Sequence, residues 1–182
     1  MPTTRSFDAL LRSALVLVCE GGVDALTLSQ VAAHAGVSRA TVYREFGDKD
    51  GLIGALAQHE IELMLAAVQS GVDVTADPLE VIAAIVVSAM RYLRDHAAFR
   101  YVRDHEPHWL LQAVLAVGGS RMDLVQTVAS LVAPAVAVTR LRVSAAQAAE
   151  VMVRTVLSHT LIEFSNLSDE EVGATVARAI IA

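Results

Sequence analysis

Polar and basic side chains gather between residues 27 and 49 in a pattern that suits contact with a nucleic acid. The stretch HAGVSRATVYREFGDKDGL (34–52) holds hydroxyls, two arginines, a tyrosine and Lys49, the only lysine of the chain. Arginine can donate two hydrogen bonds to a guanine edge, while hydroxyl and ammonium groups can bind phosphate oxygens. The chemistry that these residues offer is therefore recognition of a duplex.

A second group of polar side chains surrounds the stretch RDHEPHW (103–109). Imidazole and carboxylate groups are ligands for zinc and other transition metals. The alternative hypothesis is therefore a metal-binding helical regulator or a metalloenzyme. Pro107 interrupts any helix here, so the histidines on its two sides are not held at a fixed spacing, and a loop before a proline-started helix explains the same composition. The five candidate ligands are His96, Asp104, His105, Glu106 and His108.

The sequence offers little support for catalysis. It has no glycine-rich phosphate loop, no nucleophile elbow and no HExxH pair of metal ligands. Its one cysteine, Cys19, falls on the apolar face of a predicted helix, which favours packing over nucleophilic attack. We therefore expect no enzyme activity and no cofactor. A single cysteine excludes an intrachain disulfide, and it fits a reducing cytoplasm.

The composition of the 182 residues limits the possible partners. Apolar residues make up 54%, and mean hydropathy is +0.50, so a subunit interface or a lined cavity is expected. The longest apolar runs, 81–87 and 131–138, are far shorter than a membrane span, and the first residues make a poor signal peptide. The formal net charge is −6, of which −1 falls in residues 1–53 and −5 in 54–182. Binding of nucleic acid must then depend on a few placed residues.

The periodicity predicts an all-α protein. Strong helix starts occur where Thr27, Ser38, Asp48, Asp77, Ser144 and Ser168 can cap, and Pro78 and Pro107 fit first helical positions. Gly21-Gly22 and Gly36 mark helix ends, and Pro134 predicts a kink or an early stop. The expected helices cover about 5–20, 28–35, 39–45, 49–70, 78–95, 97–104, 107–117, 121–139, 145–165 and 169–181.

Residues 27–46 have the features of a helix-turn-helix. Two short helices must cross closely, which requires a small residue such as Ala32 and a bend residue that accepts positive φ, here Gly36. The expected apolar wedges, which pack on Leu11 and Leu15, are Val31, Ala35, Val37, Val42 and Phe46. The face that remains on the second helix is polar, as a helix in the major groove requires: Ser38, Arg39, Thr41, Tyr43, Arg44 and Glu45.

The stretch LTLSQVAAHAGVSRATVYREFGDKDGLI (26–53) resembles the DNA-binding signature of TetR-type transcriptional repressors. The cap, the small residue, the glycine, the Y-R-x-F motif and the x-K-x-x-L entry to the fourth helix all fall at the family's spacing. The signature covers about the first third of the chain. The resemblance implies a three-helix DNA-binding head at 1–48 and a helical ligand-binding and dimerisation domain at 49–182. Glu45 departs from the family, which more often has histidine there, and it could pair with Arg44 or Arg39 or accept from a cytosine amino group.

The resemblance also implies roles for single residues. Arg39 would bridge two acceptors on guanine, Ala40 would touch a thymine methyl, and Lys49, with the amides that open its helix, would bind a phosphate. The full set of implied DNA contacts is Thr27, Ser29, Ser38, Arg39, Ala40, Thr41, Tyr43, Arg44 and Lys49.

The apolar stripes of the last two helices make them the expected homodimer interface, and the TetR resemblance implies that they form a four-helix bundle with their symmetry mates. Ordinary intrachain core is the alternative for these positions. They are Ala149, Met152, Val153, Val156, Leu157, Thr160, Phe164, Val172, Val176 and Ile180.

A cavity for an apolar or amphipathic effector is expected between the head and the dimer bundle. Its candidate walls are Leu63, Met64, Ile85, Met90, Phe99, Trp109 and Met122, each of which could instead be simple core. A ligand that moved the fourth helix would change the separation of the two recognition helices on a palindromic DNA operator.

Overall fold

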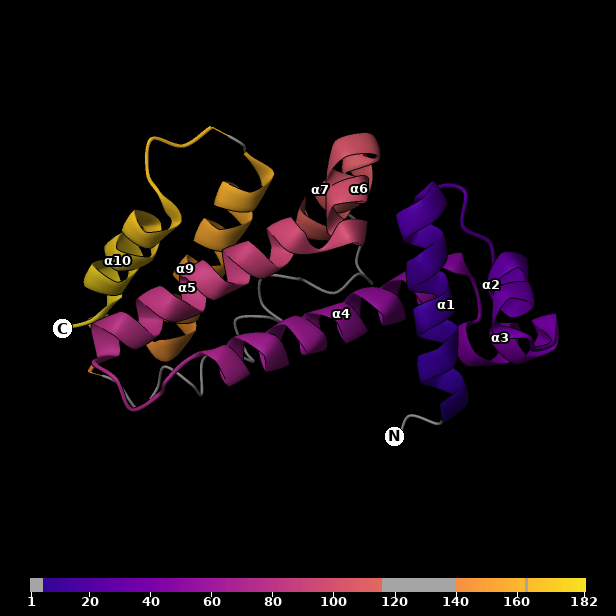
Figure 1. Cartoon of the computed structure of the whole chain (residues 1–182), viewed down its shortest axis with the longest axis horizontal. Helices are drawn as coiled ribbons and strands as arrows, with labels where there is room; N and C mark the ends of the chain where they lie inside the picture. The colour runs from indigo at the N-terminus through magenta and orange to yellow at the C-terminus, as the bar shows by residue number, and fades with distance from the viewer. Residues whose placement is uncertain (1–4, 116–139, 163) are drawn as a thin grey trace. The chain divides into compact units, whose positions relative to one another are not determined.

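The computed structural model describes residues 5–115, 140–162 and 164–182, and these residues fold into α-helices. Among them the only β pairing is an isolated bridge between Leu141 and Ile181. The all-α prediction is therefore confirmed. The helix expected at 121–139, with Pro134 and Met122, lies outside the described residues. The helices, labelled in Figure 1, are α1 (Arg5–Gly21), α2 (Leu28–Ala35), α3 (Arg39–Phe46), α4 (Lys49–Gly71), α5 (Pro78–Asp95), α6 (Ala97–His105), α7 (Pro107–Leu115), α9 (Ala145–Leu161) and α10 (Asp169–Ile180).

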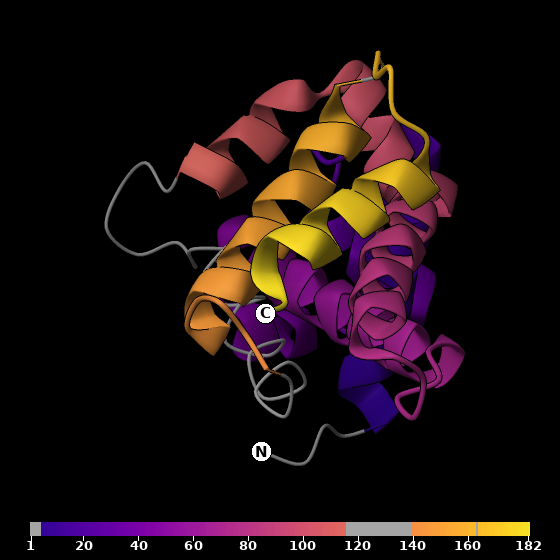
Figure 2. The same cartoon turned by 90° about the vertical axis from the view of Figure 1, so that its left-hand side faces the viewer.

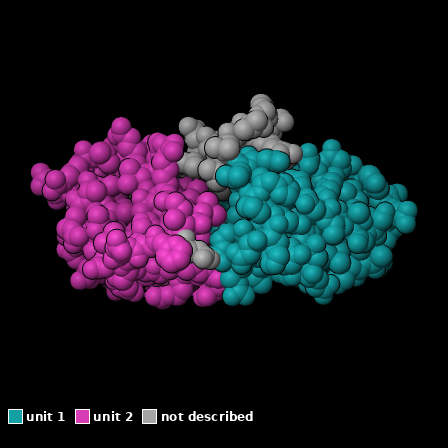
Figure 3. Space-filling model, turned by 90° about the horizontal axis from the view of Figure 1, so that it is seen from above, with its two compact units in different colours: residues 1–62, 96–112 teal, residues 63–95, 113–182 magenta. Residues whose placement is uncertain are grey.

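The chain divides into two compact units, shown in different colours in Figure 3. Unit 1 comprises residues 1–62 and 96–112, and unit 2 comprises residues 63–95 and 113–182. Helix α4 begins in unit 1 and ends in unit 2, so the head of unit 1 includes more than its first three helices. The functional boundary expected at residue 48 stays a prediction.

The predicted helix caps form at all six expected starts. Asp48 and Asp77 accept hydrogen bonds from the N–H groups of Gly51 and Leu79, at 2.8 and 2.9 Å. In each of the four hydroxyl caps, the side-chain oxygen accepts a hydrogen bond of 3.2 Å from the backbone N–H three residues later. Two of them complete the capping box, because the third helical residue reaches back to the cap's own N–H. At the first start the hydroxyl instead donates to the Gln30 side chain at 2.7 Å. The four hydroxyl caps are Thr27, Ser38, Ser144 and Ser168.

The core of unit 1 is built around α1, which buries one apolar side. Helices α2, α3, α4 and α6 contribute to the same cluster, and α1, α2 and α3 lie together in Figure 1. The ring centroids of Phe7 and Phe46 are 5.2 Å apart and join α1 to the end of α3. The buried set comprises Leu10, Leu11, Ala14, Val18, Val23, Leu26, Leu28, Val31, Ala32, Val42, Phe46, Leu52, Leu56, Ala98 and Val102.

Unit 2 packs α5 against α9 and α10, which also contact each other (Figure 2). A Cβ on Gly173 would lie 2.8 Å from the backbone oxygen of Ala83, so glycine allows α10 to approach α5 closely. One turn before Gly173, the carboxylate of Asp169 accepts hydrogen bonds from Arg94 Nη1 at both of its oxygens, at 2.6 and 2.5 Å. Arg94 Nη2 donates to the His159 backbone oxygen at 3.2 Å, so this arginine of α5 binds both α9 and α10.

Helix α9 is shorter than predicted, and this changes the expected interface. The apolar stripe predicted a helix to residue 165, but α9 ends at Leu161 and Ile162 is extended, with φ −106° and ψ 112°. Phe164 is therefore not on the helical stripe, and 95% of it is exposed.

Helix α4 is long and apolar enough to cross a membrane by length and composition alone, which is weak evidence because soluble core helices share these features. It contributes the buried residues Leu52 and Leu56 to unit 1 and Met64 and Val68 to unit 2. Its Glu60 carboxylate also lies 2.9 Å from His96 Nε2. These side chains are engaged within the protein.

We expect opposite effects of alanine at two helical glycines. Gly173→Ala should lower the free energy of unfolding of unit 2 by about 1–3 kcal/mol, because the added methyl forces backbone apart. Gly54→Ala is the control: no atom lies within 4 Å of the position that its methyl would take, and the helix gains roughly 0.5–1 kcal/mol. Thermal unfolding of both variants checks this, and stabilisation by Gly173→Ala would contradict the close packing of α10 on α5.

Candidate nucleic-acid interface

Helix α3 is anchored by two side chains one turn apart. Val42 and Phe46 are buried on the unit 1 core, as predicted for wedge residues. Since residues i and i+4 share one side of a helix, the opposite side of α3 must face outward. Gly36 at φ +69° ends α2 and Gly47 at φ +75° ends α3 itself, both in a backbone conformation that favours glycine. Together these features determine which side chains α3 presents.

The outward side of α3 carries the predicted base-reading residues. Arg39 and Ala40 are exposed at the first turn, where a recognition helix meets base edges. Tyr43 is 53% exposed and the Arg44 side chain 71% exposed, so neither is core. Thr41 is half-buried, and its hydroxyl lies 2.9 Å from that of Ser38. Their contacts with DNA stay predictions.

Glu45 pairs with its neighbour on the same helix. Its Oε1 accepts a hydrogen bond of 3.2 Å from Arg44 Nη2, which is one of the roles that the sequence left open. An exposed ion pair of this kind contributes about 0–1 kcal/mol. A phosphate that binds Arg44 must therefore compete with a weak intrahelical partner.

The start of α4 is already occupied by a carboxylate. Asp48 Oδ1 accepts a hydrogen bond of 2.8 Å from the Gly51 N–H. Gly51 is required here because a Cβ would collide with the Phe46 backbone oxygen. The amides that open α4 were predicted to bind a phosphate together with Lys49, but one of them is used by Asp48. The Lys49 side chain is therefore the main group at the start of α4 that remains to bind a phosphate.

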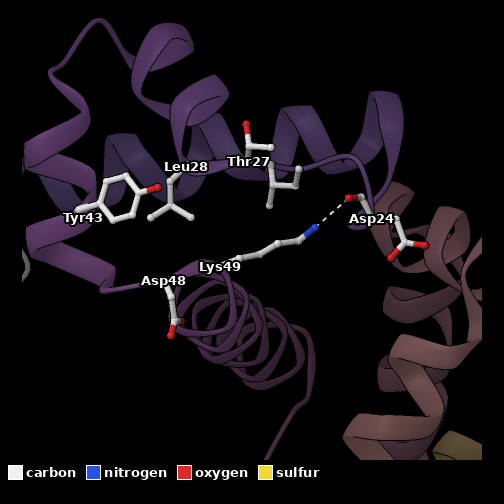
Figure 4. A pocket seen from close by; sticks show the side chains of 7 residues that line it. Asp24, Thr27, Leu28, Tyr43, Asp48 and Lys49 are labelled. Atoms are coloured by element: carbon white, nitrogen blue, oxygen red, sulfur yellow. Dashed lines mark hydrogen bonds between the residues drawn. The ribbon is translucent and has the colours of Figure 1, made fainter.

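An open pocket of about 310 Å³ lies beside the start of α4, within unit 1. Figure 4 shows the Lys49 side chain extending across it toward Asp24 and away from Tyr43. Lys49 Nζ donates a hydrogen bond of 2.8 Å to the Asp24 backbone oxygen. The pocket is lined by Asp24, Leu26, Thr27, Leu28, Tyr43, Asp48 and Lys49.

Helix α7 also contacts Asp24, through two side chains. Trp109 Nε1 donates to Asp24 Oδ1 at 2.9 Å, and His108 Nε2 lies 3.3 Å from the same oxygen. Lys49 Nζ lies 6.0 Å from the centroid of the Trp109 ring. The Trp109 hydrogen bond, with His108 and Lys49 nearby, holds the pKa of Asp24 below its ordinary value of 3.8.

A buried carboxylate closes the turn between α1 and α2. Glu106, only 8% exposed, accepts hydrogen bonds from the N–H groups of Val23 at 2.6 Å and Asp24 at 3.1 Å. Gly22, at φ +83°, has no room for a Cβ because Glu106 and Tyr101 fill that space. Sequence reasoning missed this role. The partners are 82 and 83 residues apart, and no local pattern connects them.

The five candidate metal ligands are not brought together. His96 Nδ1 caps α6 by accepting from the Phe99 N–H at 3.2 Å, and its Nε2 faces Glu60. Arg103 donates to Asp104, and His105 lies 3.1 Å from the Tyr101 oxygen. Within the described ranges no group of three or more histidine, cysteine, aspartate or glutamate side chains has the geometry to hold a metal ion.

Cys19 is half-buried on α1. Burial, followed by the nearby charges of Glu60 and Glu20, raises the pKa of its thiol. A thiol with a raised pKa is a poor nucleophile, which supports the packing role.

The candidate ligand-pocket residues are divided between the two units. In unit 2, Met64 and Met90 are buried, Ile85 is half-buried and Leu63 is exposed. Phe99 and Trp109 belong to unit 1, where the Trp109 indole is bonded to Asp24. Met122 lies outside the described residues. The effector cavity stays a prediction.

Most of the candidate interface residues are buried within one chain. Leu157 is half-buried and Phe164 is exposed, while the other eight are covered inside unit 2. Their burial matches the alternative of intrachain core. The eight are Ala149, Met152, Val153, Val156, Thr160, Val172, Val176 and Ile180.

Comparison with known proteins connects this head to one family. Residues 10–56 match the family model described as bacterial regulatory proteins, tetR family. The HTH-type transcriptional regulator BetI of Burkholderia ambifaria is 39% identical over 82 residues, which are 44% of this chain and 40% of that protein. The chain therefore matches less than half the length of that curated relative.

Solved structures resemble the whole fold. The TetR family repressor AlkX from Dietzia sp. strain DQ12-45-1b has a TM-score of 0.70 at 19% identity, covering 93% of this chain and 92% of that chain. AibR, in complex with isovaleryl coenzyme A and operator DNA, has a TM-score of 0.56 at 18% identity, covering 95% and 96%. At these identities the likeness concerns the fold.

The Asp24 contacts predict a measurable titration. The carboxyl of Asp24 should titrate below 3.8, and Trp109→Phe should raise its pKa toward that value, because the largest cause of the shift is the indole N–H. Contacts to the charged form are then present above the unfolded pKa and lost as pH falls through the lowered folded pKa. Carboxyl NMR titration checks this. Asp73, whose lowered pKa comes from Thr75, is the internal control and should not respond.

Proposed function

We propose that the chain is a TetR-type, sequence-specific DNA-binding transcriptional regulator, because its residues 10–56 match the family model described as bacterial regulatory proteins, tetR family. Its mode is repression, relieved when a small molecule releases it from the operator. The observation that carries the proposal is the polar side of α3, which faces outward because Val42 and Phe46 are buried.

Base reading is assigned to the first turn of α3. The Arg39 guanidinium matches the two acceptors of a guanine edge, and the Ala40 methyl can contact a thymine methyl. Phosphate contacts come from the remaining polar residues around the two short helices: Thr27, Ser29, Ser38, Thr41, Tyr43, Arg44 and Lys49. Since residues 1–53 carry a net charge of −1, sequence-independent attraction to DNA is weak, and specificity depends on these few contacts.

The working form is a homodimer in the bacterial cytoplasm, where operator DNA is found. One α3 covers only part of a groove, and a two-fold dimer reads half-sites about 34 Å apart or multiples of that distance. We assign the interface to α9 and α10. Because eight of the predicted interface residues are buried in unit 2, the side chains left to meet a partner include Leu157 and Phe164.

The effector is an apolar or amphipathic small molecule. AibR was solved with isovaleryl coenzyme A, and AlkX is implicated in biodegradation of n-alkanes. Buried methionines such as Met64 and Met90 supply adaptable apolar surface in unit 2 of this chain. A ligand releases DNA only to the extent that it prefers the state with lower DNA affinity.

Arg39→Ala should abolish the footprint that the wild-type protein leaves on DNA flanking its own gene. Loss of one bidentate contact costs about 1–3 kcal/mol in each half-site, so affinity should fall by tenfold or more. DNase footprinting measures the loss, and circular dichroism confirms folding.

Arg91→Ala is the matched control, since it removes the same charge from an exposed position of α5, outside both the head and the assigned interface. Its footprint should equal that of the wild type. Equal footprints for all three proteins would move base reading away from Arg39, and a wild-type protein without any palindromic footprint would contradict the proposed function.

An apolar effector should bind with a negative heat-capacity change, because apolar surface is buried. Calorimetric titration with a medium-chain fatty acid and its coenzyme A thioester, at two or more temperatures, measures this. Binding of small polar ions alone would overturn the assignment of the effector class.

A further inference from the structure

The two residues Val23 and Asp24 are held by three helices at once. The end of α6 binds both of their N–H groups through Glu106, and α7 binds the Asp24 carboxylate through Trp109 and His108. The first residue of α4, Lys49, binds the Asp24 backbone oxygen. These contacts hold the turn between α1 and α2 and thereby fix the direction of the Asp24 backbone carbonyl.

That carbonyl sets the position of the only lysine in the chain. An ammonium group has three N–H donors, and the Asp24 oxygen uses one of them, so two others can still serve a phosphate. Lys49 is half-buried, its side chain extends away from Tyr43 (Figure 4), and its Nζ lies 6.0 Å from the centroid of the Trp109 ring. A lysine side chain that is already immobilised loses less conformational freedom when it binds an anion.

We propose that Trp109 is a positioning residue for Lys49: it fixes the Asp24 side chain, Glu106 fixes the Asp24 backbone, and together they hold the Lys49 ammonium ready for a DNA phosphate. This inference rests on the proposed function, and it extends that function to a residue of α7 that does not belong to the helix-turn-helix. Phosphate affinity at the head then depends on whether the start of α7 contacts the turn between α1 and α2.

The charge balance makes the Glu106 variant informative. Glu106→Gln removes one negative charge, which alone should favour DNA binding slightly. It also turns one backbone acceptor into an N–H₂ group that faces an N–H donor. If Glu106 acts by positioning Lys49, the Glu106→Gln variant should bind DNA more weakly than the wild type, whereas the change in charge alone predicts slightly stronger binding. Glu80→Gln on α5 removes the same charge from an exposed residue outside unit 1 and outside the assigned interface, and it is the matched control.

The first experiment needs no DNA. Lysine-selective ¹³C labelling of the full chain labels Lys49 alone, and relaxation of its side-chain methylene next to Nζ reports mobility. We expect restricted motion in the wild type and in Glu80→Gln, and free motion in Trp109→Phe and Glu106→Gln. Equal mobility in all four proteins would overturn the proposal, as would a change in thermal stability without a change in mobility.

The second experiment measures coupling on the footprinted duplex. Lys49→Ala should weaken binding about tenfold in the wild type but only about twofold in Trp109→Phe, because the cation is no longer held in place. Trp109→Phe itself should cost about fivefold, the order of one immobilised side chain. Equal losses in both backgrounds would overturn the positioning role. If the wild type has no footprint, the proposed function fails, whereas the relaxation measurement still decides how Lys49 is held.

Discussion

The burial of Val42 and Phe46 on one side of α3 is the constraint on which the rest of the head depends. An eight-residue helix has too few turns to be stable alone, so its orientation comes from what it packs against. Both side chains reach the core formed with α1, and the turns at Gly36 and Gly47 let the chain enter and leave α3 within a few residues. The polar face is a consequence of this anchoring, because it is the only side of the helix that remains.

Local features of this fold could be predicted from the sequence because their causes are local. A hydroxyl that caps a helix bonds an amide three residues away, so Thr27, Ser38, Ser144 and Ser168 identified their helix starts. The same holds for the glycine at the end of α2 and for the wedge residues of α3. Each depends on a spacing that the chain itself contains.

Two other features could not be predicted, for different physical reasons. Glu106 and Trp109 bind residues 82 to 85 positions away, and a carboxylate or indole in a short helix has no local property that names its partner. The apolar stripe of α9 did predict burial, but periodicity cannot distinguish a neighbouring helix of the same chain from one of a second subunit. The structure assigns most of that stripe to contacts within unit 2, with α5 and α10 as neighbours.

The lone tryptophan of the chain lies 6.0 Å from the lone lysine ammonium, measured from the ring centroid to Nζ. Indole emission is sensitive to nearby charge and to solvent, so the unmodified protein contains an intrinsic optical reporter where the starts of α4 and α7 meet the Asp24 turn. The fluorescence of one residue can therefore follow, in real time and without dyes, any event that disturbs the start of α4 or of α7.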